Sequence, residues 1–158
     1  MGPTEVRPYD AAHDGSWAAQ VLTEVLGGIR QVRRGEAADV LSHPGLVAER
    51  DGAPVGYLAY VPADGEWELL ALAAVDLWAG AGTALVEALV ALAGDRPVSV
   101  VTTNDNVDAL RFYQRRGFRL RAVRPGAVDE TRRTLKPEIP STGAHGIPLR
   151  DELELVRP

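Results

Sequence analysis

The chain has 158 residues, no cysteine and a formal net charge of −5 at pH 7. The lack of cysteine excludes disulfides, thiolate metal sites and a cysteine nucleophile, and the negative charge argues against general binding to nucleic acid. No stretch is long and apolar enough to span a membrane, and the N-terminus has neither the basic nor the apolar region of a secretory signal. We therefore expect a cytoplasmic protein with a single domain over residues 1–158 and no membrane partner.

The N-terminal part of the sequence predicts a strand and a long helix. The strand covers Thr4–Arg7 and ends at Pro8, and the helix covers Ala11–Leu26, with Gly27 as its stop. The segment Ile29–Leu41 is charged and compatible with a second short helix, although it shows no clear period. The apolar positions that we expect to anchor the first helix are Trp17, Val21 and Val25.

Two strands with a tight turn follow. Gly45–Arg50 and Pro54–Val61 are joined by Asp51-Gly52, which is a strong hairpin signal. A longer strand over Glu66–Val75 comes next. Its nearly uninterrupted apolar character predicts a central strand with both faces covered.

The stretch after this central strand predicts a turn and a helix. Gly80-Ala81-Gly82 opens the helix and Gly94 ends it. The first N–H groups of a helix lack partners and carry partial positive charge, so this turn is either an anion site or a plain crossover. The glycines alone do not decide between the two. The expected apolar face consists of Leu85, Leu89 and Leu92, with Glu87 turned outward.

The rest of the chain alternates strands and helices. We expect Asn104 and Asp105 to cap the helix that starts at about residue 106. This order predicts an α/β fold with a central mixed sheet of about seven strands and helices on both faces. The remaining predicted elements are a strand over Val98–Thr103, a helix over Asn106–Arg116, a strand over Phe118–Val123, a short helix over Pro125–Arg133, an ordered loop over Lys136–Pro148 and a last strand over Leu149–Val156.

Three phosphate-binding patterns compete for the glycine turn. A Walker loop requires a lysine after its last glycine, and the chain has only Lys136, so this pattern is excluded. The dinucleotide fingerprint would place a third small residue where Leu85 stands, so a dinucleotide-binding domain is disfavoured. The third pattern is an acyl-CoA site.

Two motifs resemble the GNAT superfamily of N-acetyltransferases. Residues 77–82, Leu-Trp-Ala-Gly-Ala-Gly, resemble its motif A, Gln/Arg-x-x-Gly-x-Gly/Ala, except that Leu77 replaces the leading polar residue. The pattern that resembles motif B matches at every marked position and consists of Asn106, Ala109, Tyr113, Gly117 and Phe118. The resemblance implies a GNAT fold with its core over residues 4–124 and an extension over 125–158 that is similar to one bacterial branch.

The resemblance implies acetyl-CoA as co-substrate and no metal. In the superfamily the pantetheine arm lies along the central strand, and the pyrophosphate lies on the amides of the glycine turn. Asn106 would hydrogen-bond the cofactor, although capping its own helix is an equally good interpretation. The positions that match cofactor-binding roles are Leu70, Ala71, Leu72, Leu77, Trp78, Ala79, Gly80, Ala81, Gly82, Thr83 and Asn106.

The same resemblance implies roles in proton transfer. Tyr113 matches the general acid near the CoA sulfur, because a phenol stays protonated at neutral pH and can donate to a thiolate. Glu68, set between two apolar residues, is the better candidate for the general base, and Glu66 is the weaker one. Arg111 and Arg115 are four residues apart on one helix face, so we predict that they supply the countercharge that Leu77 cannot.

The leading hypothesis is a monomeric or homodimeric N-acetyltransferase. It would move the acetyl group of acetyl-CoA directly to a primary amine of an unidentified small molecule or peptide in a ternary complex. The alternative is a non-catalytic CoA-binding or sensor module of the same fold. The pair Tyr113 and Glu68 favours the enzyme, because a sensor needs neither an acid nor a base.

Overall fold

The computed structural model describes residues 2–75 and 79–158, and the chain divides into two compact units. The first unit comprises Met1–Gln31 and Asp39–Arg96. The second comprises Val32–Ala38 and Pro97–Pro158.

The first unit is built on four antiparallel strands in the order β1-β4-β5-β6. The predicted turn between β4 and β5 is confirmed, with positive φ angles of 54° at Asp51 and 78° at Gly52. The strands are β1 (Thr4–Pro8), β4 (Gly45–Arg50), β5 (Ala53–Val61) and β6 (Trp67–Ala74).

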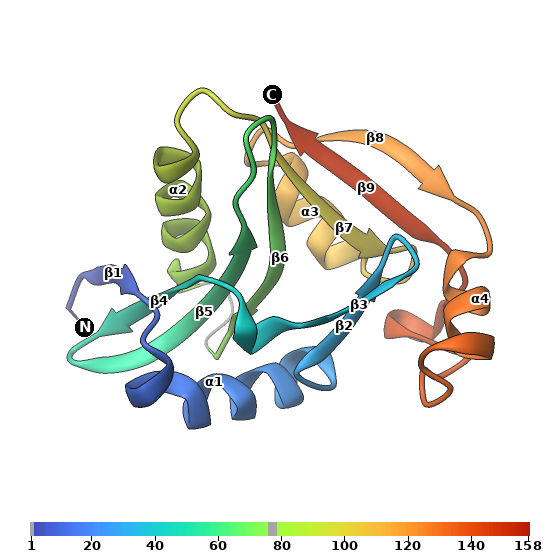
Figure 1. The fold of residues 1–158 in the computed structure, drawn as a ribbon, viewed down its shortest axis with the longest axis horizontal. Coiled ribbons are helices and arrows are strands. Elements are labelled where there is room, and N and C mark those ends of the chain that lie inside the picture. Colours follow the sequence, from blue (N-terminus) through green and yellow to red (C-terminus); the bar gives the residue numbers. More distant parts are fainter. Residues whose placement is uncertain (1, 76–78) are drawn as a thin grey trace. The chain divides into compact units, whose positions relative to one another are not determined.

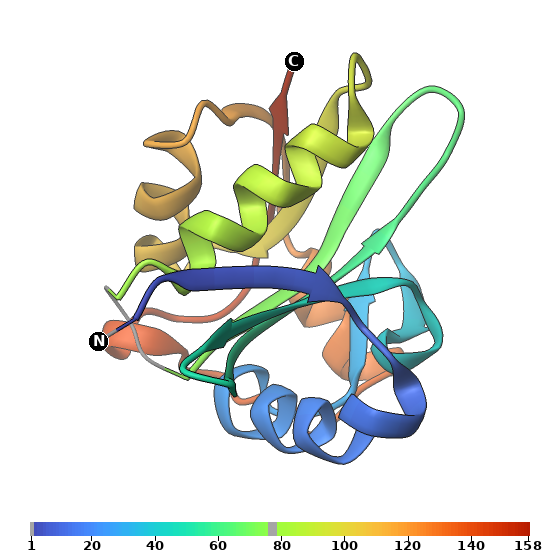
Figure 2. The same cartoon turned by 90° about the vertical axis from the view of Figure 1, so that its left-hand side faces the viewer.

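Helices α1 (Ala11–Leu26) and α2 (Ala81–Ala93) cover opposite faces of this four-stranded sheet (Figure 2). The predicted bounds of α1 are confirmed: Asp10 caps its start, and Gly27 ends it in the left-handed conformation. Two predicted anchors are wrong, because Val25 and Leu92 are 45% and 51% exposed. Both lie in the last turn of a helix. Periodicity identifies the buried face of a helix but not how far the covering sheet extends along it.

A glycine on β5 brings α2 close to the sheet. A Cβ at Gly56 would lie 2.9 Å from Cδ1 of Leu85 and 3.4 Å from Cβ of Ala81. Residue 81 is the first residue of α2, so this contact fixes the start of the helix against β5.

The prediction of a short helix within Ile29–Leu41 is wrong. The segment forms a hairpin of β2 (Arg30–Arg33) and β3 (Glu36–Asp39), followed by the single turn η1 (Val40–Ser42). Its two turn residues have φ angles of 54° at Arg34 and 77° at Gly35, which suit a two-residue hairpin turn.

The second unit contains three antiparallel strands in the order β7-β9-β8 (Figure 1). Helix α3 packs against β8. The predicted α/β class with a seven-stranded mixed sheet is confirmed. The elements of this unit are β7 (Val98–Thr103), α3 (Val107–Gln114), β8 (Arg119–Arg124), α4 (Ala127–Thr134), η2 (Ala144–Gly146) and β9 (Glu152–Arg157).

The long loop between α4 and β9 is held by the residues that we expected to cap α3. Asn104 Oδ1 accepts hydrogen bonds from the N–H groups of Arg150 and Asp151, at 3.0 and 2.9 Å. Asp105 Oδ2 accepts from the N–H of Ala144 at 2.8 Å. The cap of α3 is instead Asn106, so the predicted capping role of residues 104 and 105 is wrong.

Candidate functional site

Helix α2 begins after a glycine and has no side-chain cap. Its N-cap is Gly80, with φ 93° and ψ −4°, a left-handed conformation that favours glycine, and no side chain caps the helix. The first intrahelical bond runs from Ala84 N–H to Gly80 O, at 3.0 Å. The amides of Ala81 and Gly82 lie ahead of this bond, and the first turn carries no acidic residue. Backbone amides and the helix dipole therefore combine at this end of α2.

Four further residues predicted to bind the cofactor lie on either side of the glycine turn. Ala79 accepts a hydrogen bond at its carbonyl from Nη2 of Arg50, at 2.8 Å. Thr83 lies in the first turn of α2. Leu77 and Trp78, which were also predicted to belong to the cofactor site, lie outside the described residues.

An irregularity in β6 falls on the predicted pantetheine-binding positions. Ala71 pairs with Ala59 and Leu69 pairs with Tyr60, so Leu70 is an extra residue in the ladder to β5. Leu72 pairs in register with Leu58. A bulge of this kind takes backbone groups out of regular pairing and turns them in a new direction. The backbone of Leu70 is thus suited to a partner other than β5.

The two candidate carboxylates differ in placement. Glu68 lies in β6 opposite Val61 and is 7% exposed. Glu66 lies before the start of β6 and is half-buried, so the predicted strand began one residue too early. The intervening Trp67 stacks on Tyr60, with ring centroids 5.3 Å apart. Of the two, only Glu68 is a buried carboxylate held by the sheet.

Tyr113 lies in α3 and is 6% exposed. Its ring makes edge contacts with Phe112 and Phe118, at centroid distances of 5.2 and 5.3 Å. Burial raises the pKa of Tyr113 above the ordinary tyrosine value, so the phenol is protonated at neutral pH. Such a group can donate a proton but cannot serve as a base under these conditions.

The other motif B residues have local structural roles. Asn106 Oδ1 accepts the N–H of Ala109 at 3.1 Å, so its capping role is established by the structure. Gly117 has φ 90°, a left-handed conformation that reverses the chain after α3. Phe118 follows and donates its N–H to the carbonyl of Tyr113 at 3.1 Å. These contacts fix the end of α3 around the tyrosine.

The segment 111–124 is rich in arginine, and its arginines have different surroundings. Arg111 pairs with Asp108 at 3.5 Å on the exposed face of α3, and Arg115 is the C-cap of that helix. Arg116 lies over the ring of Phe112, 3.7 Å from its centroid. Arg111 and Arg115, which were predicted to bind phosphate, therefore lie at α3, whereas Arg116 packs on an aromatic ring of the same helix.

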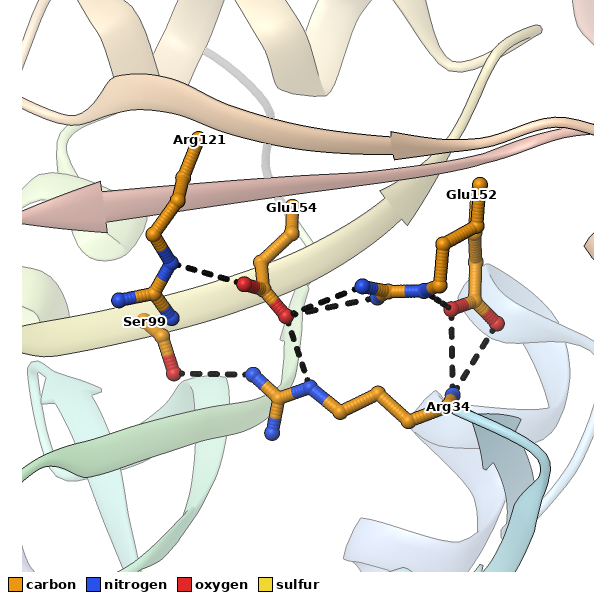
Figure 3. Close-up of polar contacts among 6 residues, drawn as sticks. Arg34, Ser99, Arg121, Glu152 and Glu154 are labelled. Atoms are coloured by element: carbon orange, nitrogen blue, oxygen red, sulfur yellow. Dashed lines mark hydrogen bonds and ion pairs between the residues drawn. The ribbon is translucent and has the colours of Figure 1, made fainter.

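Arg121 and Arg124 belong to an ion-pair cluster on β8 and β9, which also receives the tip of the β2-β3 hairpin (Figure 3). Nε of Arg121 and Nε of Arg34 each lie 2.8 Å from the carboxylate of Glu154. Nε of Arg124 lies 2.9 Å from Glu152, which also accepts the backbone N–H of Arg34. The charges of Arg121 and Arg124 are therefore engaged in ion pairs within the protein.

The carboxylate at the centre of this cluster is stabilised in its charged form. Burial by itself raises the pKa of Glu154, but hydrogen bonds from Arg121 and Arg34 outweigh burial, so the pKa lies below the ordinary value. Arg34 also donates to the hydroxyl of Ser99 at 3.3 Å. Arg34 was not predicted to form this contact, because its acidic partner Glu154 is 120 residues away in the sequence.

Residues 2–75 and 79–158 contain no group of three or more histidine, cysteine or acidic residues that could hold a metal ion. None of their helices has the length and apolar character needed to cross a membrane. Nε2 of His145 lies 3.0 Å from Oδ2 of Asp108.

Comparisons with known proteins agree with this description. The model of the Acetyltransferase (GNAT) family matches residues 24–118. YxbD of Bacillus subtilis (strain 168), an uncharacterized protein, is 42% identical over 110 residues, which are 68% of this chain and 69% of the relative. The uncharacterized protein YdhI of the same organism is 41% identical over 105 residues, 65% of each chain.

Solved structures show the same fold at low sequence identity. A GNAT family acetyltransferase from Elizabethkingia anophelis with acetyl-CoA bound has a TM-score of 0.76 and 17% identity, and covers 97% of this chain and 96% of its own. An IAA acetyltransferase from Bacillus cereus ATCC 14579 has a TM-score of 0.75 and 19% identity, covering 98% of both chains. A Bacillus subtilis acetyltransferase in complex with CoA has a TM-score of 0.71 and 17% identity, covering 98% and 97%. With its family match, its motifs and its fold, this chain belongs to the GNAT family of acetyltransferases.

Proposed function

We propose that this protein transfers the acetyl group of acetyl-CoA directly to a primary amine of a small molecule or peptide. The observation that carries the proposal is the start of α2, which follows β6 and presents backbone amides without a capping side chain or an acid. In a member of the GNAT family, this is where the pyrophosphate of CoA is expected. Related structures with bound acetyl-CoA and CoA support the choice of donor.

The proposed cofactor contacts come mainly from backbone groups. The amides of residues 80–83 would bind the pyrophosphate, and residues 77–79 would lead into this turn. The irregular pairing at Leu70 supports a pantetheine arm that hydrogen-bonds along residues 70–72 of β6. Asn106, whose Oδ1 already caps α3, would contribute its amide nitrogen to the cofactor. Arg111 and Arg115 would lie near the 3′-phosphate.

The proposed chemistry needs one base and one acid. The acceptor amine must be neutral to attack the acetyl carbonyl, and Glu68 would accept the proton that the amine loses, directly or through a water. Glu66 is the alternative base. The C–S bond then breaks, and Tyr113 would donate its hydroxyl proton to the departing thiolate. The raised pKa of Tyr113 supports this role, because it keeps the phenol protonated until the thiolate forms.

The test is turnover of acetyl-CoA with a panel of primary amines, followed by thiol release. Tyr113→Phe and Glu68→Gln should each lower kcat by about a hundredfold, the usual scale for loss of general acid–base catalysis. CoA affinity should stay nearly unchanged in both variants, because neither residue is assigned to the phosphates.

Two matched variants control for the loss of a buried hydroxyl and of a carboxylate. Tyr57→Phe removes a buried hydroxyl that has no hydrogen-bond partner within the described residues, and it should leave kcat within about twofold. Glu87→Gln changes an exposed carboxylate on α2 and should do the same. If wild-type protein binds CoA but acetylates no amine, the non-catalytic alternative is favoured. Full activity of Tyr113→Phe would remove the assigned acid.

A further inference from the structure

The late loop, residues 135–151 between α4 and β9, is bound to the two residues that precede the cap of α3. Nδ2 of Asn104 donates to the carbonyl of Pro148 at 2.8 Å, and its Oδ1 accepts two further N–H groups of the same loop. Asp105 is 8% exposed, and its Oδ2 accepts the N–H of Ala144 at 2.8 Å. Two side chains that could have capped α3 are therefore engaged by the loop.

These contacts, rather than side-chain preference, select Asn106 as the cap of α3. Aspartate and asparagine are about equally good caps. Oγ1 of Thr103 donates to Oδ1 of Asp105 at 2.5 Å, and the N–H of Asn106 donates to the carbonyl of Thr103 at 3.1 Å, so residues 103–106 form one turn. If Asp105 were released, it could cap α3 itself, and Asn106 would become the first residue within the helix. Its side chain would then point elsewhere, because each helical position is rotated by about 100° from the last.

The loop approaches Asp105 so closely that the loop residue beside it must be a glycine. A Cβ at Gly143 would lie 2.8 Å from Cβ of Asp105 and would overlap its carboxylate. The backbone of Gly143 is extended, with φ −99° and ψ −153°, so the contact with Asp105 and not the backbone conformation excludes a side chain. The position of Asp105 therefore depends on the position of the loop.

We propose that Asp105, held by the late loop, is a positioning residue for Asn106 in the binding of CoA, an inference that rests on the proposed function. Oδ1 of Asn106 caps α3, so the amide nitrogen is the group that donates to the cofactor. Asp105 keeps Asn106 at the cap and thereby fixes the direction of this nitrogen. The late loop thus contributes to cofactor binding through Asp105 rather than by contact with CoA.

The test is a double-mutant cycle on CoA affinity, measured by calorimetric titration. Asn106→Ser keeps a side-chain oxygen for the cap but lacks the amide nitrogen, so it should weaken CoA by about tenfold, the scale of a hydrogen-bonding group left unpaired. Asp105→Ala should weaken CoA by about fivefold. Because Asp105 acts through Asn106, the double variant should bind CoA no more weakly than Asn106→Ser alone. Asp105→Asn keeps an oxygen for the N–H of Ala144 and an amide that the hydroxyl of Thr103 can accept, so it should lose less, about twofold.

Gly143→Ala tests the same link from the side of the loop. The added methyl group displaces the carboxylate of Asp105 and should weaken CoA by about fivefold, with no further loss when it is combined with Asn106→Ser. The matched control is Arg132→Gln, which removes the bond from Nε of Arg132 to the carbonyl of Ile139 at 2.9 Å and other bonds to the same loop. It leaves the contact with Asp105 in place and should stay within about twofold.

Each outcome decides the inference. CoA affinity within about twofold of the wild type in either Asp105→Ala or Gly143→Ala would overturn it, and so would an equal loss in the control Arg132→Gln. Losses that multiply in the double variant would also overturn it, because Asp105 would then act independently of Asn106. If Asp105→Ala does not fold, the cycle of Gly143→Ala and Asn106→Ser decides by the same results. Failure of the wild type to bind CoA would instead contradict the proposed function, whereas wild-type affinity in Asn106→Ser would overturn the inference and leave CoA binding intact.

Discussion

The two helices of the first unit begin in opposite ways. At the start of α1, Asp10 accepts the N–H of Ala12 at 3.1 Å, and Asp14 accepts the N–H of Asp10 at 2.9 Å. Asp14 also receives both terminal nitrogens of Arg7 at 2.8 Å. At the start of α2, the cap is a glycine, the first turn has no acid, and a buried arginine lies nearby. The start of α1 is capped by side chains of the protein itself, whereas the start of α2 has no side-chain cap, and we propose that the pyrophosphate of CoA binds there.

The largest effect on CoA affinity should come from a larger side chain at the start of α2. Gly82→Val places a branched side chain in the first turn of α2, where we propose that the pyrophosphate approaches the backbone. CoA affinity should fall by about a hundredfold or more, so that thermal stabilisation by CoA, about 2–3 kcal/mol at a hundredfold excess over Kd in the wild type, is lost. Val90→Ala, in the last turn of α2, is the control for helix stability. If CoA raised the melting temperature of Gly82→Val as much as that of the wild type, a phosphate site at the start of α2 would be contradicted.

The next effect concerns the start of α1, where the contribution of Asp14 to stability depends on pH. Hydrogen bonds from Arg7 lower the pKa of Asp14 from 3.8 to about 2. Because the folded-state pKa lies below the unfolded one, Asp14 contributes stability above about pH 4, and this contribution is lost as the pH falls towards 2. Its size is about 2 kcal/mol.

Denaturant unfolding between pH 2 and 7 measures this contribution. The variant Asp14→Asn should lose stability at pH 7 and show a flatter dependence between pH 4 and 2, while CoA affinity at pH 7 stays within about twofold. The exposed Asp64→Asn is the matched control and should follow the wild-type curve. If the free energy of unfolding of Asp14→Asn fell with pH as steeply as that of the wild type, other carboxylates would be responsible for the loss of stability in acid.

A smaller effect should follow from making α2 resemble α1. Asp14 lies four residues after the cap of α1, and Ala84 lies four residues after the cap of α2. Ala84→Asp should stabilise the ligand-free protein slightly through the helix dipole, by about 0.5 kcal/mol, and weaken CoA by about tenfold through charge repulsion. Ala84→Asn, without the charge, should leave affinity within about threefold. Equal affinities of the two variants would contradict an anion site at this end of α2.

The elements that could be predicted from sequence carry strong local signals. The bounds of α1 follow from an aspartate before the helix and a glycine after it, and the first hairpin follows from Asp51-Gly52. The β2-β3 hairpin was missed because its strands have only four residues each and their charges hide the alternation. Its turn, Arg34-Gly35, was the available signal.

The candidate site was less predictable, because its contacts join residues that are distant in sequence. Three successive polar residues, Asn104, Asp105 and Asn106, could each have capped α3. The late loop binds the first two and leaves the third for the helix. Arg50 was missed for a similar reason, since the carbonyl that it holds is 29 residues away. Motif positions can be assigned locally, but contacts that come from another strand cannot.

The outer strand β8 has a consequence for how copies of this protein meet in solution. It ends its sheet, and its residues Leu120 and Val123 are 55% and 57% exposed, so an apolar strand edge faces outward. Such an edge is a template for pairing with another chain. Arg121 and Arg124 form ion pairs with the glutamates of β9, and the pairing of β8 with β9 is irregular between Leu120 and Ala122. Such a bulge in an edge strand disfavours the regular pairing of two copies through β8.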